Sequence, residues 1–188
     1  MAKPDVVGLL AHIIPQLEAL KVKIIMRPTE FVYGDSLGYW DPGLSVIEIS
    51  IHDPGMWPTV LAHEYGHVLQ NLAGRFLDQA PWDVFSEFLK TGKSDARALK
   101  RAVRCIQAAE LEAERTALSL ARMFSLCDEE DYIRKANDYI FKHEFARRHG
   151  FWPKESGFQA TTPKKLISAS AFAQIPRESE VLWLDRGR

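Results

Sequence analysis

Apolar residues near the start of the chain recur with the spacing of an amphipathic helix. Between Asp5 and Leu20 they return every three or four positions, at Val6, Leu9, Leu10, Ile13, Ile14, Leu17 and Leu20. This spacing predicts one helix with a buried face. Pro15 lies inside the pattern. Because proline lacks a backbone N–H, we expect it to kink or divide the helix.

The next part of the chain has the pattern of short strands. The segment from Lys21 to Arg27 is rich in β-branched residues, and the segment from Leu44 to Ile51 alternates in part between apolar and polar side chains. A shorter strand is expected from Phe31 to Tyr33, before a turn at Gly34. These segments predict a small antiparallel sheet of two or three strands, placed directly before a helix.

The rest of the chain is predicted to be mainly helical. Helical spacing and end signals predict helices at Pro81–Lys90, Asp95–Leu126 and Glu129–Arg148, the last capped by Asp128. The expected fold class is therefore α+β, mainly helical with a small antiparallel sheet. Residues 1–150 are expected to form one domain. Residues 151–188, rich in Gly, Pro, Ser and Lys, are expected to form an irregular tail packed on this domain or on a partner.

Composition narrows the possible partners and the compartment. With 188 residues that are 46% hydrophobic, the chain can bury a core, and a net charge of −1 gives no reason to expect nucleic acid or an anionic membrane as the main partner. No apolar run is long enough to span a bilayer. If one helix carries both Cys105 and Cys127, about 22 positions at about 1.5 Å each hold them roughly 33 Å apart. That excludes a mutual disulfide and favours a cytoplasmic location.

The helix expected after the sheet carries an H-E-x-x-H motif from His63 to His67. Residues four apart lie on one helical face, so the two imidazoles can bind a single cation. A third protein ligand and an open water position would complete a catalytic zinc site. Glu64 is rotated by about 100° from His63 and about 60° from His67, so it can reach a water there more easily than the metal. Pro58 fits the first turn of this helix and Gly74 its end.

The opposite side of the same helix is apolar. Leu61, Tyr65, Val68 and Leu72 recur at helical spacing on the side away from the histidines. A helix with this pattern buries its apolar side in a core and turns the other side toward a cleft. This context favours a true metal site over a chance occurrence of the motif.

Three acidic residues in the long helix that follows lie at different angles around the helix axis. If Leu99 is taken as zero and each residue adds about 100°, Glu110 falls at about 20°, Glu112 at about 220° and Glu114 at about 60°. The apolar stripe around zero consists of Val103, Ile106, Ala113, Ala117, Ala121 and Phe124. A carboxylate buried in such a stripe costs several kcal/mol unless a cation compensates it. Glu110 is therefore the expected third metal ligand, the alternative being a salt bridge to Lys or Arg of another helix. Glu112 is expected in solvent.

Glu114 lies at the edge of the stripe, one turn after Glu110. From there its carboxylate can accept a hydrogen bond from the second nitrogen of a ligand histidine.

H-E-Y-G-H followed by E-L-E-A-E at Glu110–Glu114 resembles the gluzincin zinc metallopeptidases. In that family a glutamate binds zinc and an acid four residues later supports a histidine. The resemblance implies that Glu110 is the ligand and Glu114 the supporting acid, although Glu114 replaces the usual Asp. The small size, with a helix and a small sheet before the zinc helix, is similar to ImmA/IrrE-type and phage-encoded metallopeptidases, which have a minimal zincin fold. The resemblance covers about residues 1–150.

The expected function is zinc-dependent hydrolysis of peptide bonds in a peptide or protein substrate. One Zn²⁺ per chain would be held by His63, His67 and Glu110, with Glu64 as general base. His143 and Tyr139 are candidates for stabilising the oxyanion, the alternative for each being a packing or surface role. An extended peptide could pair with a strand edge beside the metal helix, unless the protein's own loops cover that edge.

Two other functions are weighed against this hypothesis. The first is a zinc-bearing regulatory or interaction protein of the ImmA/IrrE type, with little or no general proteolysis. The second is nucleic-acid binding through the basic stretches Ala146–His149 and Pro163–Lys165, for which a solvated surface is the better interpretation. Neither the substrate sequence nor the oligomeric state follows from the chain.

Overall fold

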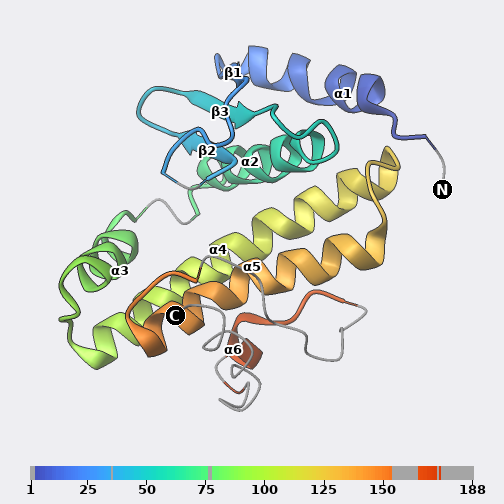
Figure 1. Cartoon of the computed structure of the whole chain (residues 1–188). Helices are drawn as coiled ribbons and strands as arrows, with labels where there is room; N and C mark the ends of the chain where they lie inside the picture. The colour runs from blue at the N-terminus through green and yellow to red at the C-terminus, as the bar shows by residue number, and fades with distance from the viewer. Residues whose placement is uncertain (1–2, 35, 76–77, 154–164, 173, 175–188) are drawn as a thin grey trace. The chain divides into compact units, whose positions relative to one another are not determined.

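The computed structural model describes residues 3–34, 36–75, 78–153, 165–172 and 174 (Figure 1). It is mostly helical with one small sheet, which confirms the α+β class. In chain order the elements are α1 (Val6–Ala19), β1 (Lys23–Arg27), β2 (Gly38–Asp41), β3 (Val46–Ser50), α2 (Trp57–Leu72), α3 (Ala80–Thr91), α4 (Ala96–Met123), α5 (Glu129–His149) and α6 (Ala169–Phe172).

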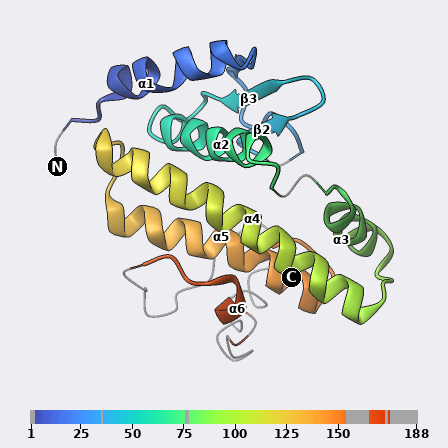
Figure 2. The same ribbon diagram turned by 180° about the vertical axis from the view of Figure 1, so that it is seen from behind.

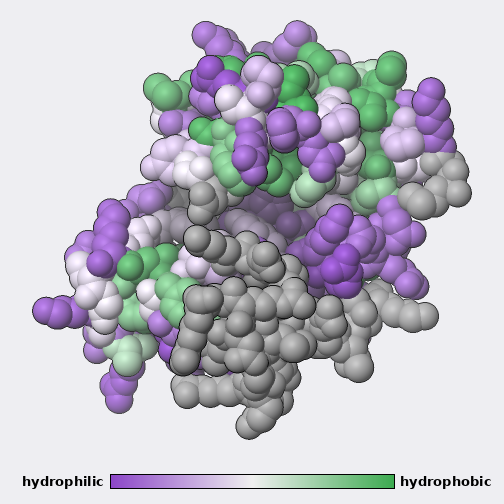
Figure 3. All heavy atoms as spheres, viewed as in Figure 1, coloured by the Kyte–Doolittle hydropathy of each residue, from purple (hydrophilic) through white to green (hydrophobic). Residues whose placement is uncertain are grey.

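The chain forms two compact units that alternate along the sequence. The first unit contains Met1–Arg75 and Glu112–Tyr132, and the second contains Phe76–Leu111 and Ile133–Arg188. The boundary falls inside α4, which nevertheless runs as one uninterrupted helix. On the face of the first unit seen in Figure 3, polar and apolar side chains are interspersed.

Helix α1 has the buried face that its sequence predicts. The Asp5 carboxylate accepts a hydrogen bond of 2.8 Å from the Gly8 backbone N–H and so caps the first turn. The residues of this helix that are fully buried are Leu9, Ile13 and Leu17. Pro15 lies within the helix without dividing it.

The sheet differs from the prediction in direction and in one strand. Its order is β1-β3-β2, with β2 antiparallel to β3 but β1 parallel to β3. The expectation of a purely antiparallel sheet is therefore wrong. The strand expected at Phe31–Tyr33 is also wrong, because this region contributes only an isolated bridge from Tyr33 to Ser36 and the strand is Gly38–Asp41. β2 pairs on the far side of β3, and β1 and β3 run in the same direction.

The core of the first unit joins the sheet to the apolar side of α2. Ile47 and Ile49 of β3 are fully buried in one cluster with Leu61, Tyr65 and Val68. Figures 1 and 2 show β2 and β3 beside α2 from both sides. Leu72 was expected in the buried stripe but is 55% exposed. It is the last residue of α2 and lies beyond the buried part of that helix.

The end signals of the helices act as expected. Pro58 lies in the first turn of α2, and Gly74 follows its end with a φ of +66°. The Asp131 backbone N–H donates to the Asp128 carboxylate over 2.9 Å at the start of α5, and Gly150 follows α5 with a φ of +80°. Cys105 and Cys127 form no disulfide with each other.

The second unit has two apolar clusters of its own. One contains Phe85, Leu99, Val103, Ile106 and Ala146. The other contains Leu111, Ile140, Phe141, Phe145 and Phe172, so that α6 packs against α5. Most of the tail expected from residue 151 onward lies outside the described residues. Within the described part of the chain, no helix is long and apolar enough to cross a membrane.

Candidate metal centre

The two histidines of α2 converge as their spacing predicts. His63 Nε2 and His67 Nε2 lie 3.0 Å apart, and the two rings meet nearly at right angles, with an interplanar angle of 82°. The side chains project from adjacent turns of one regular helix, so backbone geometry alone brings them together.

The other nitrogen of each ring contacts an oxygen of this chain. Glu114 Oε1 lies 3.1 Å from His63 Nδ1, an ion-pair distance, although the angle is not that of an aligned hydrogen bond. Gln70 Oε1 lies 2.9 Å from His67 Nδ1. The Gln70 oxygen favours a proton on Nδ1 of His67, which leaves a lone pair on His67 Nε2.

The His67 Nε2 lone pair can accept a hydrogen bond from His63 Nε2 across 3.0 Å. A cation bound to both nitrogens would take the place of this hydrogen bond, and two imidazole nitrogens are donors that suit a metal ion.

Glu110 completes a group of three ligands. One ligand atom from each of His63, His67 and Glu110 lies within 4.8 Å of the others. Glu110 is 3% exposed and precedes the buried Glu114 by one turn of the continuous helix α4. Its predicted burial is confirmed.

Glu112 differs from both neighbours, as helical phase predicts. Its side chain is 26% exposed and forms an ion pair of 2.6 Å with Arg75. Glu112 is therefore partly shielded by a surface arginine rather than fully in solvent, and it lies outside the group of three potential ligands.

Glu64 lies against the edge strand of the sheet. A Cβ added to Gly38 of β2 would be only 2.6 Å from Glu64 Oε1 and 2.5 Å from Val60 Cγ1. The missing side chain at Gly38 therefore makes the room in which the Glu64 carboxylate sits, and Glu64 is buried there. The sequence prediction missed Gly38, although a glycine within a strand commonly marks such a close approach.

Gly66, the fourth residue of the H-E-Y-G-H segment, allows α4 to approach α2 closely. A Cβ at this position would lie 2.9 Å from Ala113 Cα and 3.0 Å from the Ala113 carbonyl oxygen. This contact fixes the distance between the helix of the two histidines and the helix of Glu114.

Two other residues near the histidines were not predicted. Gln70 is buried one turn after His67, and Tyr132 of the first unit donates a hydrogen bond from its hydroxyl to Glu114 Oε2. For Gln70 the sequence offers only a weak signal, a glutamine near the end of the helix that carries the H-E-x-x-H motif. Nothing in the local sequence around Tyr132 indicates its partner.

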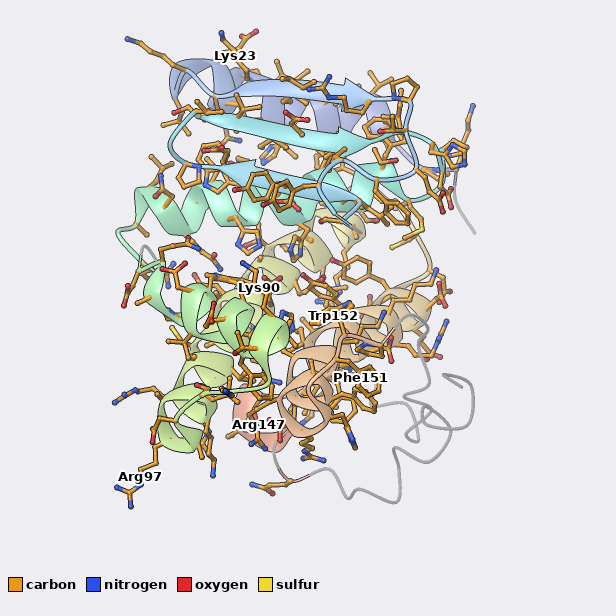
Figure 4. The ribbon with its side chains drawn as sticks, turned by 60° about the vertical axis from the view of Figure 1, so that its left-hand side comes forward. Lys23, Lys90, Arg97, Arg147, Phe151 and Trp152 are labelled. Carbon is orange, nitrogen blue, oxygen red and sulfur yellow. The ribbon has the colours of Figure 1, made fainter. Side chains whose placement is uncertain are left out.

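His143, a predicted candidate, is fully buried among aromatic rings of the second unit. Its ring centre lies 4.9 Å from that of Trp152 (labelled in Figure 4), 5.5 Å from Tyr139, 5.8 Å from Phe85 and 5.9 Å from Trp82. Burial lowers the pKa of His143, and the negative charge of Glu110 raises it by less. A neutral His143 beside Glu110 fits either packing or hydrogen-bond donation.

Tyr139, the other candidate, is 36% exposed on α5, and its ring lies nearly at right angles to that of His143. The basic stretch Ala146–His149 is not an open cationic face, because Ala146 is buried and both Arg147 and Arg148 donate to Glu144 over 2.7 to 2.8 Å. Of the stretch Pro163–Lys165, only Lys165 belongs to the described residues.

No protein-family model, curated protein or solved structure matches this chain. The functional conclusion therefore depends on the geometry around His63 and His67. That geometry contains a group of two imidazoles and one carboxylate that could hold a metal ion.

Proposed function

We propose that this protein is a zinc-dependent metallopeptidase of the gluzincin type. The observation that carries the proposal is the convergence of His63, His67 and Glu110, whose ligand atoms lie within 4.8 Å of one another. Two histidines and one glutamate are a ligand set of catalytic zinc in peptidases, and imidazole with carboxylate suits this metal. The Gln70 oxygen beside His67 Nδ1 supports the same assignment, because ligand histidines usually donate their other N–H to such a group.

A zinc ion at this position would supply Lewis acidity, which lowers the pKa of a water molecule and polarises a peptide carbonyl. Glu64 is the general base. Its carboxylate accepts a proton from the attacking water and passes this proton to the nitrogen of the leaving amine. His143 and Tyr139 are the proposed donors to the oxyanion that forms at the carbonyl.

The edge strand β2 supports an extended peptide as the substrate. The Ser50 N–H donates to the Leu37 carbonyl over 2.7 Å, and the same register places Tyr39 opposite Glu48. Because hydrogen-bonded pairs alternate in an antiparallel ladder, the backbone N–H groups of Gly38 and Trp40 point away from β3. Gly38 itself is buried, and its carbonyl oxygen accepts a hydrogen bond from the Ser36 hydroxyl. A peptide strand would therefore pair at Trp40, two residues along β2 from the glycine that packs against Glu64.

The test is a comparison of the Glu64→Gln variant with the wild type and with Glu112→Gln, which also removes one negative charge. Zinc content, folding and cleavage of a broad peptide library are measured for each protein. We expect Glu64→Gln to retain zinc and fold but to lose hydrolysis, because it removes the base and leaves the ligands. Glu112→Gln should retain all three properties.

Native-rate cleavage by Glu64→Gln would show that Glu64 is not the base. If zinc-loaded wild type cleaves no peptide of the library, the regulatory alternative replaces the peptidase.

A further inference from the structure

A hydrogen bond from α5 reaches the metal centre through Glu114. The Tyr132 hydroxyl donates to Glu114 Oε2, while Glu114 Oε1 lies 3.1 Å from His63 Nδ1. One carboxylate therefore accepts the hydrogen bond of the tyrosine and lies at ion-pair distance from the histidine. All three residues belong to the first unit.

We propose that Tyr132 is a positioning residue of the metal centre, which holds the Glu114 carboxylate in the orientation that fixes the His63 ring. The proposal depends on the metal site of the proposed function, but not on peptidase activity. Tyr132 would act on the site only through Glu114.

The need for such a residue follows from the freedom of a glutamate side chain. The terminal torsion of a glutamate is broad, so a carboxylate with only one oxygen in contact can turn away from its partner. A hydrogen bond from a hydroxyl to a charged carboxylate is strong and fixes the second oxygen. Burial, and then the charge of Glu114, raise the pKa of Tyr132 well above its ordinary value, so the hydroxyl keeps its proton at neutral pH.

The two ligand histidines differ in how they are oriented. Gln70, which contacts His67 Nδ1, lies on the same helix three residues later. The acid beside His63 comes from a different helix, α4, and its own anchor comes from Tyr132 at the start of α5. The orientation of His63 therefore depends on residues of other helices, whereas that of His67 depends on a residue of its own helix.

Tyr65 provides a matched control in the same unit. It is buried on α2 itself, and its hydroxyl donates to Gln16 Oε1 over 2.6 Å on the side away from the histidines. Tyr65→Phe and Tyr132→Phe each remove one hydrogen-bonded hydroxyl. Only Tyr132→Phe removes a contact of Glu114.

The experiment measures the zinc affinity of the full-length variants by competition with a chromophoric chelator. We expect Glu114→Gln to lose about 10–100-fold in affinity and Tyr132→Phe roughly 10-fold. Tyr65→Phe should stay within about twofold of the wild type, because it leaves the Glu114 contact intact. The double variant of Tyr132→Phe with Glu114→Gln should lose no more than Glu114→Gln alone, since the tyrosine acts through that carboxylate.

Wild-type affinity in Tyr132→Phe, or a further loss in the double variant, would overturn the proposal. A wild type that binds no zinc would instead refute the metal site, so the two failures are distinguishable.

Discussion

The Gly66→Ala substitution tests the close contact that sets the distance between α2 and α4. Within a helix, replacing glycine by alanine normally stabilises a protein by about 0.5–1 kcal/mol. At Gly66 the added Cβ would lie 2.9 Å from Ala113 Cα and 3.0 Å from Ala113 O. Both are backbone atoms, so no side-chain rotation can relieve the overlap. Overpacking of this kind typically costs about 1–3 kcal/mol, and we expect a net loss of about 1–2 kcal/mol.

The measurement is urea unfolding in the presence of a chelator, because bound zinc would add its own stabilisation to the folded state. Gly43→Ala is the control, since its nearest contact is the Asp41 carboxylate at 3.3 Å, which accepts a hydrogen bond from the Leu44 N–H and is not a backbone atom. The control should change stability by less than about 0.5 kcal/mol. A Gly66→Ala protein that is more stable than the wild type by about 1 kcal/mol would refute the close approach of α4.

Three further predictions address the ligands, the base and a buried ion pair. Glu110→Gln should weaken zinc binding strongly in a chelator competition, whereas Glu112→Gln should not, because only the first carboxylate belongs to the ligand group. Gly38→Ala should retain zinc but slow peptide cleavage, since a methyl group 2.6 Å from Glu64 Oε1 displaces the base; equal rates would contradict this. Burial raises the pKa of Glu144, but its two arginine partners outweigh burial and lower the pKa. The loss of stability in Glu144→Gln should therefore be full above about pH 5 and shrink as the pH falls, and a loss independent of pH would be evidence against the ion pair.

The residues that the sequence predicts best are those whose place depends on regular helical geometry. The convergence of His63 and His67 needs only the pitch of α2. The burial of Glu110, compared with the partial exposure of Glu112, needs only the phase of α4 and the apolar side of the same helix. These features could be predicted because local periodicity determines them.

The features that the sequence does not predict depend on contacts between distant segments. The order and direction of the strands are such a feature. The sequence patterns of Lys23–Arg27 and Val46–Ser50 do not reveal that these strands pair in parallel or that β2 pairs on the far side of β3. The strand Gly38–Asp41 was missed, since its sequence GYWD does not alternate between apolar and polar residues. Tyr132 lies 18 positions from Glu114, and only the folded chain brings the two side chains together.

The most direct test of the metal centre is a crystal structure of the zinc-loaded protein with anomalous scattering measured at the zinc edge. We predict one zinc peak per chain, about 2.0–2.2 Å from the Nε2 atoms of His63 and His67 and from a carboxylate oxygen of Glu110. Carefully purified, folded protein that takes up no zinc would contradict this assignment, and so would a peak coordinated by Glu112 instead of Glu110.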